Sequence, residues 1–206
     1  MTMRFTDFKN KNRSIAVVGL GYVGLPLAVA LARHFTVIGF DIAEKRVALL
    51  NQGKDTTNEV DAGAMGATTA IFTTDPKDLA AASVIIVAVP TPVDNHKTPD
   101  LTPITKACVT VGRAMSAGCV VVFESTVYPG VTEEICVPIL KRESGLVFGK
   151  DFTVGNTKER INPGDKVNTR ETVGKMRAAS GEASRGLGGE EHGEGGRRGS
   201  TQPTAI

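Results

Sequence analysis

Three glycines at positions 19, 21 and 24 have the spacing G-x-G-x-x-G, which is typical of dinucleotide-binding loops that connect a strand to a helix. Gly19 permits a tight turn, Gly21 lets the backbone approach a pyrophosphate, and Gly24 lets the helix pack close to the strand. The N-terminus of that helix would present N–H groups and a partial positive charge to the phosphates. A glycine turn that binds no ligand is the alternative, and the strand-to-helix context favours the binding loop.

Asp41 stands at the end of the second expected strand, about 20 residues beyond the glycine motif, as the dinucleotide fingerprint requires. Its carboxylate is suited to accept hydrogen bonds from ribose hydroxyls and would repel a 2′-phosphate, which favours NAD over NADP as the cofactor. Asp41 also suits the cap of a helix that begins at Ile42, and one residue can do both. Arg46 weakens the NAD preference a little, because a nearby arginine can hold that phosphate. A solvated helix face is the interpretation we favour for Arg46.

Two further loops, residues 89–93 and 124–130, follow buried strands at their carboxyl ends, where ligands bind in open α/β sheets. Ordinary turn chemistry of their prolines is at least as consistent with these sequences as a ligand site, and Glu124 is consistent with a structural role. Hydroxyls for the cofactor or for an ordered water would come from Thr91, Ser125 and Thr126. With the three glycines, Asp41 and Arg46, the expected cofactor-binding residues are Tyr22, Val23, Pro90, Thr91 and Thr126.

Short apolar, β-branched runs alternate with segments of helical periodicity, and short loops connect them. The expected strands are residues 14–18, 36–40, 70–73, 84–89 and 120–123. The expected helices are residues 25–35, 42–50, 76–82, 103–116 and 132–141, whereas 58–67 has no assignment. Thr102 is the expected cap of the fourth helix, and Pro138 should kink the fifth or end it early. The alternation favours an α/β fold, a doubly wound Rossmann-type parallel sheet with helices on both faces.

Composition favours a small molecule as the ligand. Twenty-four Lys and Arg against twenty-two Asp and Glu leave a net charge of +2, too small and scattered to indicate nucleic acid or a membrane surface. The first residues lack the features of a signal peptide and no apolar run is long enough to span a bilayer, so we expect a cytoplasmic protein. Cys108, Cys119 and Cys136 lack metal-ligand spacing and are expected to pack in the core, so no metal is expected.

The chain divides by composition into three expected parts. Residues 1–13 form an N-terminal extension, and residues 14–175 form a NAD-binding domain. Residues 176–206 form an expected disordered tail, since from 178 onward the chain is mostly Gly, Glu, Arg and Ser, with one leucine and no aromatic residue. Such a segment buries too little apolar surface to offset the entropy of ordering it.

Several segments, taken in order, resemble the UDP-glucose/GDP-mannose dehydrogenase family: IAVVGLGYVGLPLAVALA, VIGFDI, VPTPVDNHKTPDLTPI, ESTVYPGVTEE and ERINPGDK. The nearest resemblance is to the bacterial UDP-N-acetylhexosamine 6-dehydrogenases of polysaccharide and O-antigen synthesis, and it spans roughly residues 13 to 175. It implies oxidation of the C6 alcohol of a UDP-sugar to a carboxylate in two NAD-dependent steps, through a thiohemiacetal on a catalytic cysteine. Such enzymes are expected to be homodimers.

The resemblance also implies roles for individual residues. Thr126 and Glu159 match the family's threonine and glutamate that position the catalytic water, Arg160 adjoins that glutamate, and the three glycines and Asp41 match NAD contacts. The chain departs from the family where residues 156–158, Asn-Thr-Lys, replace its usual Tyr-Ser-Pro. Nothing after Lys175 resembles the region with the family's catalytic lysine, asparagine and Gly-Gly-x-Cys nucleophile. We therefore expect an incomplete, cofactor-binding portion that is inactive alone; a non-catalytic dinucleotide-binding protein is the alternative.

Overall fold

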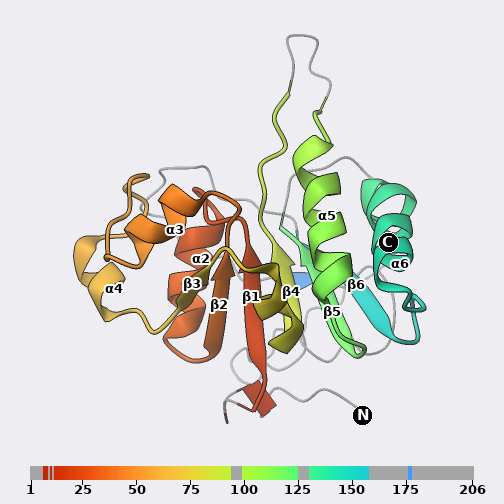
Figure 1. Ribbon diagram of the computed structural model, residues 1–206, viewed down its shortest axis with the longest axis horizontal. Helices are drawn as coiled ribbons and strands as arrows, with labels where there is room; N and C mark the ends of the chain where they lie inside the picture. The colour runs from red at the N-terminus through yellow and green to blue at the C-terminus, as the bar shows by residue number, and fades with distance from the viewer. Residues whose placement is uncertain are drawn as a thin grey trace, which may run out of the picture.

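A parallel sheet forms the centre of the protein, in a computed structural model that describes residues 7–8, 10, 12–93, 99–124, 130–157 and 176–177 (Figure 1). Within these residues the sheet has seven strands in the order β3-β2-β1-β4-β5-β6-β7. Their bounds are β1 Ser14–Val18, β2 Thr36–Phe40, β3 Ile71–Thr73, β4 Ala82–Val87, β5 Cys119–Phe123, β6 Phe152–Thr157 and β7 Met176–Arg177. Strands β1 to β6 pair in parallel, and β7 pairs antiparallel with β6. The doubly wound sheet expected from the sequence is confirmed.

The central strands are apolar because helices cover the sheet on both sides. Every residue of β1 and of β5 is buried, which is the pattern of parallel strands with two packed faces. One face packs on α2 Gly24–Ala32, α3 Glu44–Leu50 and α4 Ala62–Ala67. The other face packs on α5 Thr102–Ala114, α6 Val137–Ser144 and a short 3-10 helix, η1 Pro76–Ala81. Figure 1 shows α5 and α6 together in front of β4 to β6.

The chain reverses its winding direction between β1 and β4, which are neighbours in the sheet although β2 and β3 separate them in sequence. From β1 the chain moves outward to β2 and β3, and then returns to β4 and continues through β5 to β6. At such a reversal the loops that leave the two central strands diverge to opposite faces of the sheet and leave a crevice for a ligand. The loops after β1 and β4 therefore define where a site is to be sought.

Two sequence predictions in the helices are wrong. Thr102 does not cap α5; instead, its backbone N–H donates to Oδ1 of Asp100 at 2.8 Å, because the aspartate lies two residues before the start of the helix and offers a charged acceptor. Pro138 does not end the last helix early, while the kink expected there as the alternative stays a prediction. A π-helical turn, Thr132–Cys136, precedes α6, and Pro138 lies in the first turn of α6, where its missing N–H has no helical partner to lose. The helix then continues to Ser144 and ends at Gly145, whose φ is 69°.

Other elements were not expected. The unassigned segment contains α4, which Asp61 caps by accepting a hydrogen bond from the N–H of Ala64 at 2.9 Å. Strand β6 was missed, and so was the pairing of Asn156 and Thr157 with Arg177 and Met176. Met176 and Arg177, the first two residues of the expected tail, thus form a strand, while residues 178–206 lie outside the described part. No helix in the described part is long and apolar enough to cross a bilayer.

Candidate cofactor-binding site

Hydrogen bonds between neighbouring strands continue past the strand ends and hold three loops at one edge of the sheet. The N–H of Gly19 donates to the carbonyl of Phe40 at 2.8 Å, and the N–H of Ala88 donates to the carbonyl of Val18 at 2.8 Å. The N–H of Glu124 donates to the carbonyl of Val87 at 2.9 Å. The residues after β1, β4 and β5 are therefore fixed beside one another at the carboxyl edge, where open α/β sheets bind ligands.

The three glycines differ in what a side chain would meet. Gly19 has φ +92°, and a Cβ there would lie 2.9 Å from the carbonyl oxygen of Ala88. A Cβ on Gly24 would lie 1.7 Å from the carbonyl oxygen of Gly19, so the start of α2 can approach the end of β1 only without a side chain. A Cβ on Gly21 would meet nothing within 4 Å. Two glycines thus serve the turn and the packing, and Gly21 borders open space that a ligand can enter.

The N-terminus of α2 is suited to bind an anion. The helix has nine residues, has no acidic residue in its first turn, and has no side-chain cap at Val23. Its first backbone bond joins the N–H of Leu25 to the carbonyl of Gly21 at 3.2 Å. The N–H groups that precede this bond have no helical acceptor, and the helix dipole adds positive potential to them. Together with the open space at Gly21, these groups fit the pyrophosphate of a dinucleotide.

Asp41 binds the glycine loop directly. Its Oδ2 accepts a hydrogen bond from the N–H of Leu20 at 2.8 Å, and its Oδ1 accepts one from the N–H of Ala43 at 2.9 Å. The second bond closes the turn before α3, which begins at Glu44 rather than at Ile42. Each carboxylate oxygen can accept a further hydrogen bond, and Asp41 is half-buried. The side chain therefore fixes the loop and still has acceptor capacity for ribose hydroxyls.

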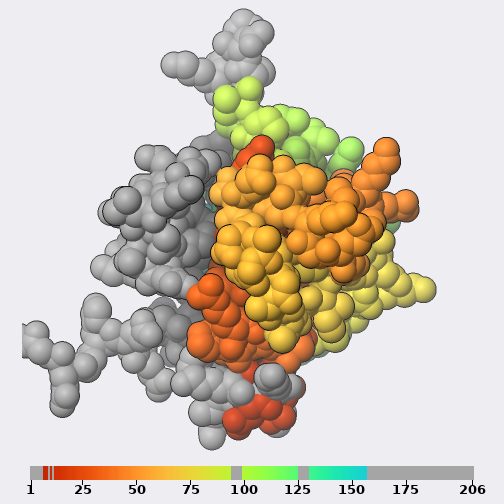
Figure 2. Space-filling view, turned by 90° about the vertical axis from the view of Figure 1, so that its left-hand side faces the viewer, coloured from red at the N-terminus to blue at the C-terminus, as the bar shows by residue number. Residues whose placement is uncertain are grey.

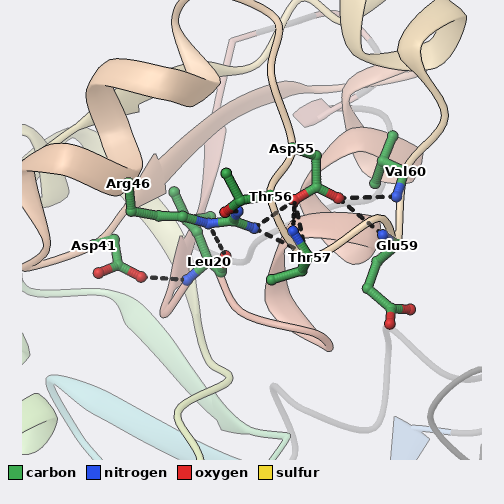
Figure 3. A network of polar contacts seen from close by, with 8 residues as sticks. All are labelled: Leu20, Asp41, Arg46, Asp55, Thr56, Thr57, Glu59 and Val60. Atoms are coloured by element: carbon green, nitrogen blue, oxygen red, sulfur yellow. Dashed lines mark hydrogen bonds and ion pairs between the residues drawn. The ribbon is translucent and has the colours of Figure 1, made fainter.

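Arg46 does not lie on a solvated helix face, so that interpretation is wrong. Its Nε donates to the carbonyl of Leu20 at 3.0 Å, and its Nη1 donates to Oγ1 of Thr56 at 2.9 Å. Its Nη2 donates to Oγ1 of Thr57 at 3.1 Å and lies 2.8 Å from Oδ1 of Asp55. Figure 3 shows the guanidinium reaching from α3 toward the loop that carries Asp55, on the side away from Asp41. The arginine thus links that loop to the glycine loop.

The Asp55 carboxylate organises the loop between α3 and α4. It accepts hydrogen bonds from the N–H groups of Thr57 at 2.9 Å, Glu59 at 2.9 Å and Val60 at 3.1 Å, and from the Thr57 hydroxyl at 2.7 Å. Its side chain is only 2% exposed. Burial alone would raise the pKa of Asp55, but the hydrogen bonds from Thr57, Val60 and Arg46 outweigh burial and lower the pKa from 3.8 to about 2. Asp55 is therefore a charged residue at neutral pH, and its charge is paired with Arg46.

The side of the molecule formed by α3, α4 and their connecting loop is a continuous surface (Figure 2, orange to yellow). The role of the loop between α3 and α4 was not predicted from the sequence. Its signal was present, since the run Asp-Thr-Thr-Asn at 55–58 contains the residues that form side-chain-to-backbone turns. Asn58 has φ 54°, the only non-glycine residue with positive φ among those described, as the tight wrap around Asp55 requires.

The remaining candidate residues divide into those that the structure describes and those outside it. Thr91, after β4, has a buried hydroxyl oxygen with no hydrogen-bond partner. An unpartnered buried hydroxyl is costly unless something else satisfies it, so Thr91 fits a residue that binds a ligand. Pro90 and Tyr22 are exposed, Tyr22 by 62%, and Val23 is half-buried. The candidates that lie outside the described residues are Ser125, Thr126, Glu159 and Arg160.

All three cysteines of the chain are buried and free, which confirms the expected core role. A hydrogen bond with Cys136 that favours the protonated thiol, together with burial, raises the pKa of Cys108 far above its ordinary range. Burial raises the pKa of Cys119 to about 12. Neither of these two thiols forms a thiolate near neutral pH, and a thiol without solvent access is inert as a nucleophile. Among the described residues, no group of three His, Cys, Asp or Glu side chains is placed to hold a metal ion.

Comparison with known proteins gives one consistent family. The model of the UDP-glucose/GDP-mannose dehydrogenase family, NAD binding domain, matches residues 13–184. Protein CapL of Staphylococcus aureus is 56% identical over 165 residues, which are 80% of this chain and 39% of CapL. The UDP-N-acetyl-D-glucosamine 6-dehydrogenase of Pseudomonas aeruginosa is 51% identical over 171 residues, 82% of this chain and 40% of that enzyme. The chain therefore spans about two fifths of the length of these relatives.

Solved structures agree with the sequence relatives. The UDP-D-ManNAc dehydrogenase of Pyrococcus horikoshii superposes with a TM-score of 0.67 at 35% identity, covering 73% of this chain and 37% of that one. A ternary complex of GDP-mannose dehydrogenase from Pseudomonas aeruginosa superposes with a TM-score of 0.65 at 30% identity, covering 72% of this chain and 36% of that one. Both likenesses cover most of this chain and about a third of the larger proteins.

Proposed function

The chain belongs to the UDP-glucose/GDP-mannose dehydrogenase family and carries its NAD-binding domain, and we propose that it takes part in the oxidation of a nucleotide sugar. The proposed reaction converts the C6 alcohol of a UDP-linked N-acetylhexosamine to the uronic acid with NAD as oxidant. Relatives named as UDP-N-acetyl-D-glucosamine 6-dehydrogenases, at 51% and 46% identity, support this substrate class. In this proposal the described residues form the cofactor-binding portion, and the substrate is a small molecule rather than nucleic acid or a membrane.

One observation carries the cofactor assignment: the open space at Gly21, bordered by the N-terminus of α2 and by Asp41. No side chain caps α2, so its first N–H groups are available for the pyrophosphate. Asp41 is held in place by Leu20 and can accept hydrogen bonds from the adenosine ribose. The buried Thr91 hydroxyl supplies a further polar group at the carboxyl end of β4. When bound, NAD supplies the hydride acceptor that oxidation at C6 needs.

The resemblance assigns the water-positioning step to Thr126 and Glu159, and these roles remain proposals because both residues lie outside the described part. The same chemistry needs a thiolate nucleophile to hold the aldehyde. Cys108, Cys119 and Cys136 are all buried in the core and do not fit that role. The proposed contribution of the described residues is therefore cofactor binding. The reactive thiol is contributed by a residue other than these three cysteines.

The buried thiols also support a second candidate function, a dinucleotide-binding protein that does not transfer hydride. Both functions need the glycine loop and Asp41, so binding of NAD is common to them. They differ in turnover, because only a dehydrogenase with an accessible nucleophile converts the sugar to the uronic acid.

A turnover assay with a binding control tests the proposal. The purified 206-residue chain is mixed with NAD⁺ and UDP-N-acetylglucosamine, and NADH formation is followed by absorbance, while NAD⁺ binding is measured separately by calorimetry. Binding without turnover is expected for the cofactor-binding portion. Turnover by this chain would show that its own residues complete the reaction, contradicting the limited role. Absence of NAD⁺ binding by the folded chain would reject both candidate functions.

A further inference from the structure

Arg46 is a cation close to Asp41, the carboxylate proposed to bind the ribose. Its charge is already paired with the Asp55 carboxylate inside the protein. Asp41 and Arg46 bind the two sides of one residue, the N–H and the carbonyl of Leu20. An arginine in this neighbourhood is the residue type that accommodates the 2′-phosphate of NADP. Whether the Arg46 guanidinium is available to a ligand therefore affects the choice between NAD and NADP. This inference rests on the proposed function, in which the chain binds NAD.

The hydrogen bonds of Arg46 leave its guanidinium little capacity for a ligand. Nε binds Leu20, Nη1 binds Thr56, and Nη2 binds both Thr57 and Asp55. Of the five N–H donors on a guanidinium, four thus have partners within the protein. The Arg46 side chain is 11% exposed, so the group is already largely withdrawn from solvent.

Asp55 is what keeps the guanidinium in this position. The carboxylate is 2% exposed and lies 2.8 Å from Nη2 of Arg46. If Arg46 turned toward a phosphate, Asp55 would be left as a buried carboxylate without its counter-charge, which is strongly unfavourable. Thr57 strengthens the arrangement, since its hydroxyl donates to Asp55 at 2.7 Å and accepts from Arg46 at 3.1 Å. The loop between α3 and α4 therefore competes directly with a 2′-phosphate for Arg46.

We propose that Asp55 determines cofactor specificity by holding Arg46 on the carbonyl of Leu20 and withholding its charge from a 2′-phosphate. Asp55 acts through Arg46 and is a positioning residue. In this arrangement, Asp41 repels the 2′-phosphate directly, and Asp55 withholds from it the charge of a nearby arginine. The site thereby selects NAD by two carboxylates, of which Asp41 is the one assigned to the ribose and Asp55 acts through Arg46.

The test is the ratio of dissociation constants for NADP⁺ and NAD⁺, measured by calorimetry on the full 206-residue chain. Asp55→Asn keeps the shape of the side chain and removes the charge that retains Arg46. The ratio of the NADP⁺ constant to the NAD⁺ constant is expected to fall about tenfold, since a released arginine can form a charge-assisted bond to phosphate. Adding Arg46→Met to the same chain should reverse this gain. A parallel weakening of both cofactors in Asp55→Asn, with the ratio unchanged, would overturn the proposal.

Asp61→Asn is the matched control, because it makes the same charge change in the same region at a residue that binds Ala64 rather than Arg46. Its ratio should equal that of the unmodified chain, and an equal shift in both variants would also overturn the proposal. If Asp55→Asn melts too early for titration, Thr57→Val loosens the same contact, and a smaller fall in the ratio is expected. If the unmodified chain itself does not bind NAD⁺, this result would instead reject the proposed function.

Discussion

The backbone N–H of Leu20 donates to Oδ2 of Asp41 at 2.8 Å, across 21 positions of sequence. The carbonyl of the same residue accepts from Nε of Arg46 at 3.0 Å. Leu20 is the residue between Gly19 and Gly21. Both of its backbone polar groups are therefore bound by side chains that follow β2 or lie on α3. The position of the phosphate-binding loop is therefore set by side chains outside the loop as well as by its glycines.

Gly21→Ala should separate binding from folding. A Cβ at Gly21 meets nothing within 4 Å, so the free energy of unfolding should stay unchanged or rise by up to about 1 kcal/mol, because alanine restricts the unfolded chain. The methyl group enters the space assigned to the pyrophosphate, so the dissociation constant for NAD⁺ should rise about tenfold or more. Urea unfolding and calorimetric titration measure the two effects. Unchanged NAD⁺ affinity would show that the pyrophosphate lies elsewhere.

Gly24→Ala is the matched substitution with the opposite expected result. Its Cβ would lie 1.7 Å from the carbonyl oxygen of Gly19, a backbone atom that cannot rotate away. The start of α2 would have to move from β1, and the free energy of unfolding should fall by about 3 kcal/mol. The same urea unfolding experiment checks this value, and a variant as stable as Gly21→Ala would contradict the packing described for the loop.

Thr91→Val tests whether the unpartnered hydroxyl serves a ligand. Valine has the same shape and removes a buried polar atom that has no partner, so the protein without cofactor should gain about 1 kcal/mol of stability. Affinity for NAD⁺ should fall, because the hydroxyl is lost to the ligand. Thr153→Val is the control, since Thr153 has the same kind of buried hydroxyl and lies near the amino end of β6, away from these loops. Equal NAD⁺ affinities in the two variants would remove Thr91 from the site.

Asp55 should make stability depend on acid pH. Its pKa is lowered from 3.8 to about 2 in the folded protein, so the folded state binds this proton less readily than the unfolded chain. The stabilisation, about 2 kcal/mol, is present above the unfolded pKa and is lost as the pH falls from about 4 through about 2. Urea unfolding across this range should show a steeper loss for the unmodified chain than for Asp55→Asn. Equal slopes would mean that the carboxylate is not held as described.

The cysteines should be unreactive in the folded protein. Cys108, Cys119 and Cys136 are buried, and the thiols of Cys108 and Cys119 have raised pKa values. A colorimetric disulfide reagent near neutral pH should therefore label fewer than one thiol per folded chain, and three after unfolding in urea. Rapid labelling of one thiol before unfolding would reveal an accessible nucleophile and would reopen the assignment of catalytic chemistry to this chain.

The sequence predicted the parts of the fold that depend on local pattern. Strands β1 and β2 have the bounds expected from their β-branched apolar runs, and the glycine loop and Asp41 lie together where the fingerprint places them. These features are readable because a buried parallel strand is apolar throughout and because three glycines at fixed spacing have few other uses.

Features that depend on tertiary contacts were not predicted. Arg46 follows Asp41 in the charged run Glu44-Lys45-Arg46, and only the folded loop brings Asp55 and Thr57 to it. Strand β6 contains Gly155 and Asn156, which are weak strand signals, and it forms by pairing with β5 from Phe152 to Asn156. The role of Asp100 is different, because its bond to the N–H of Thr102 is local, and it was missed because Asp and Thr are both common helix caps. For Arg46 and β6 the deciding partner lies in another part of the chain, which local periodicity does not reveal.

Calorimetric titration of the 206-residue chain with NAD⁺, repeated on Asp41→Asn, tests the central claim most directly. The substitution keeps the size of the side chain and removes the charge that binds Leu20 and is assigned to the ribose. Saturable binding at one site per chain is expected, with affinity at least about tenfold weaker in Asp41→Asn. Absence of binding by a chain that melts cooperatively, or equal affinity in the two proteins, would contradict the account of the site.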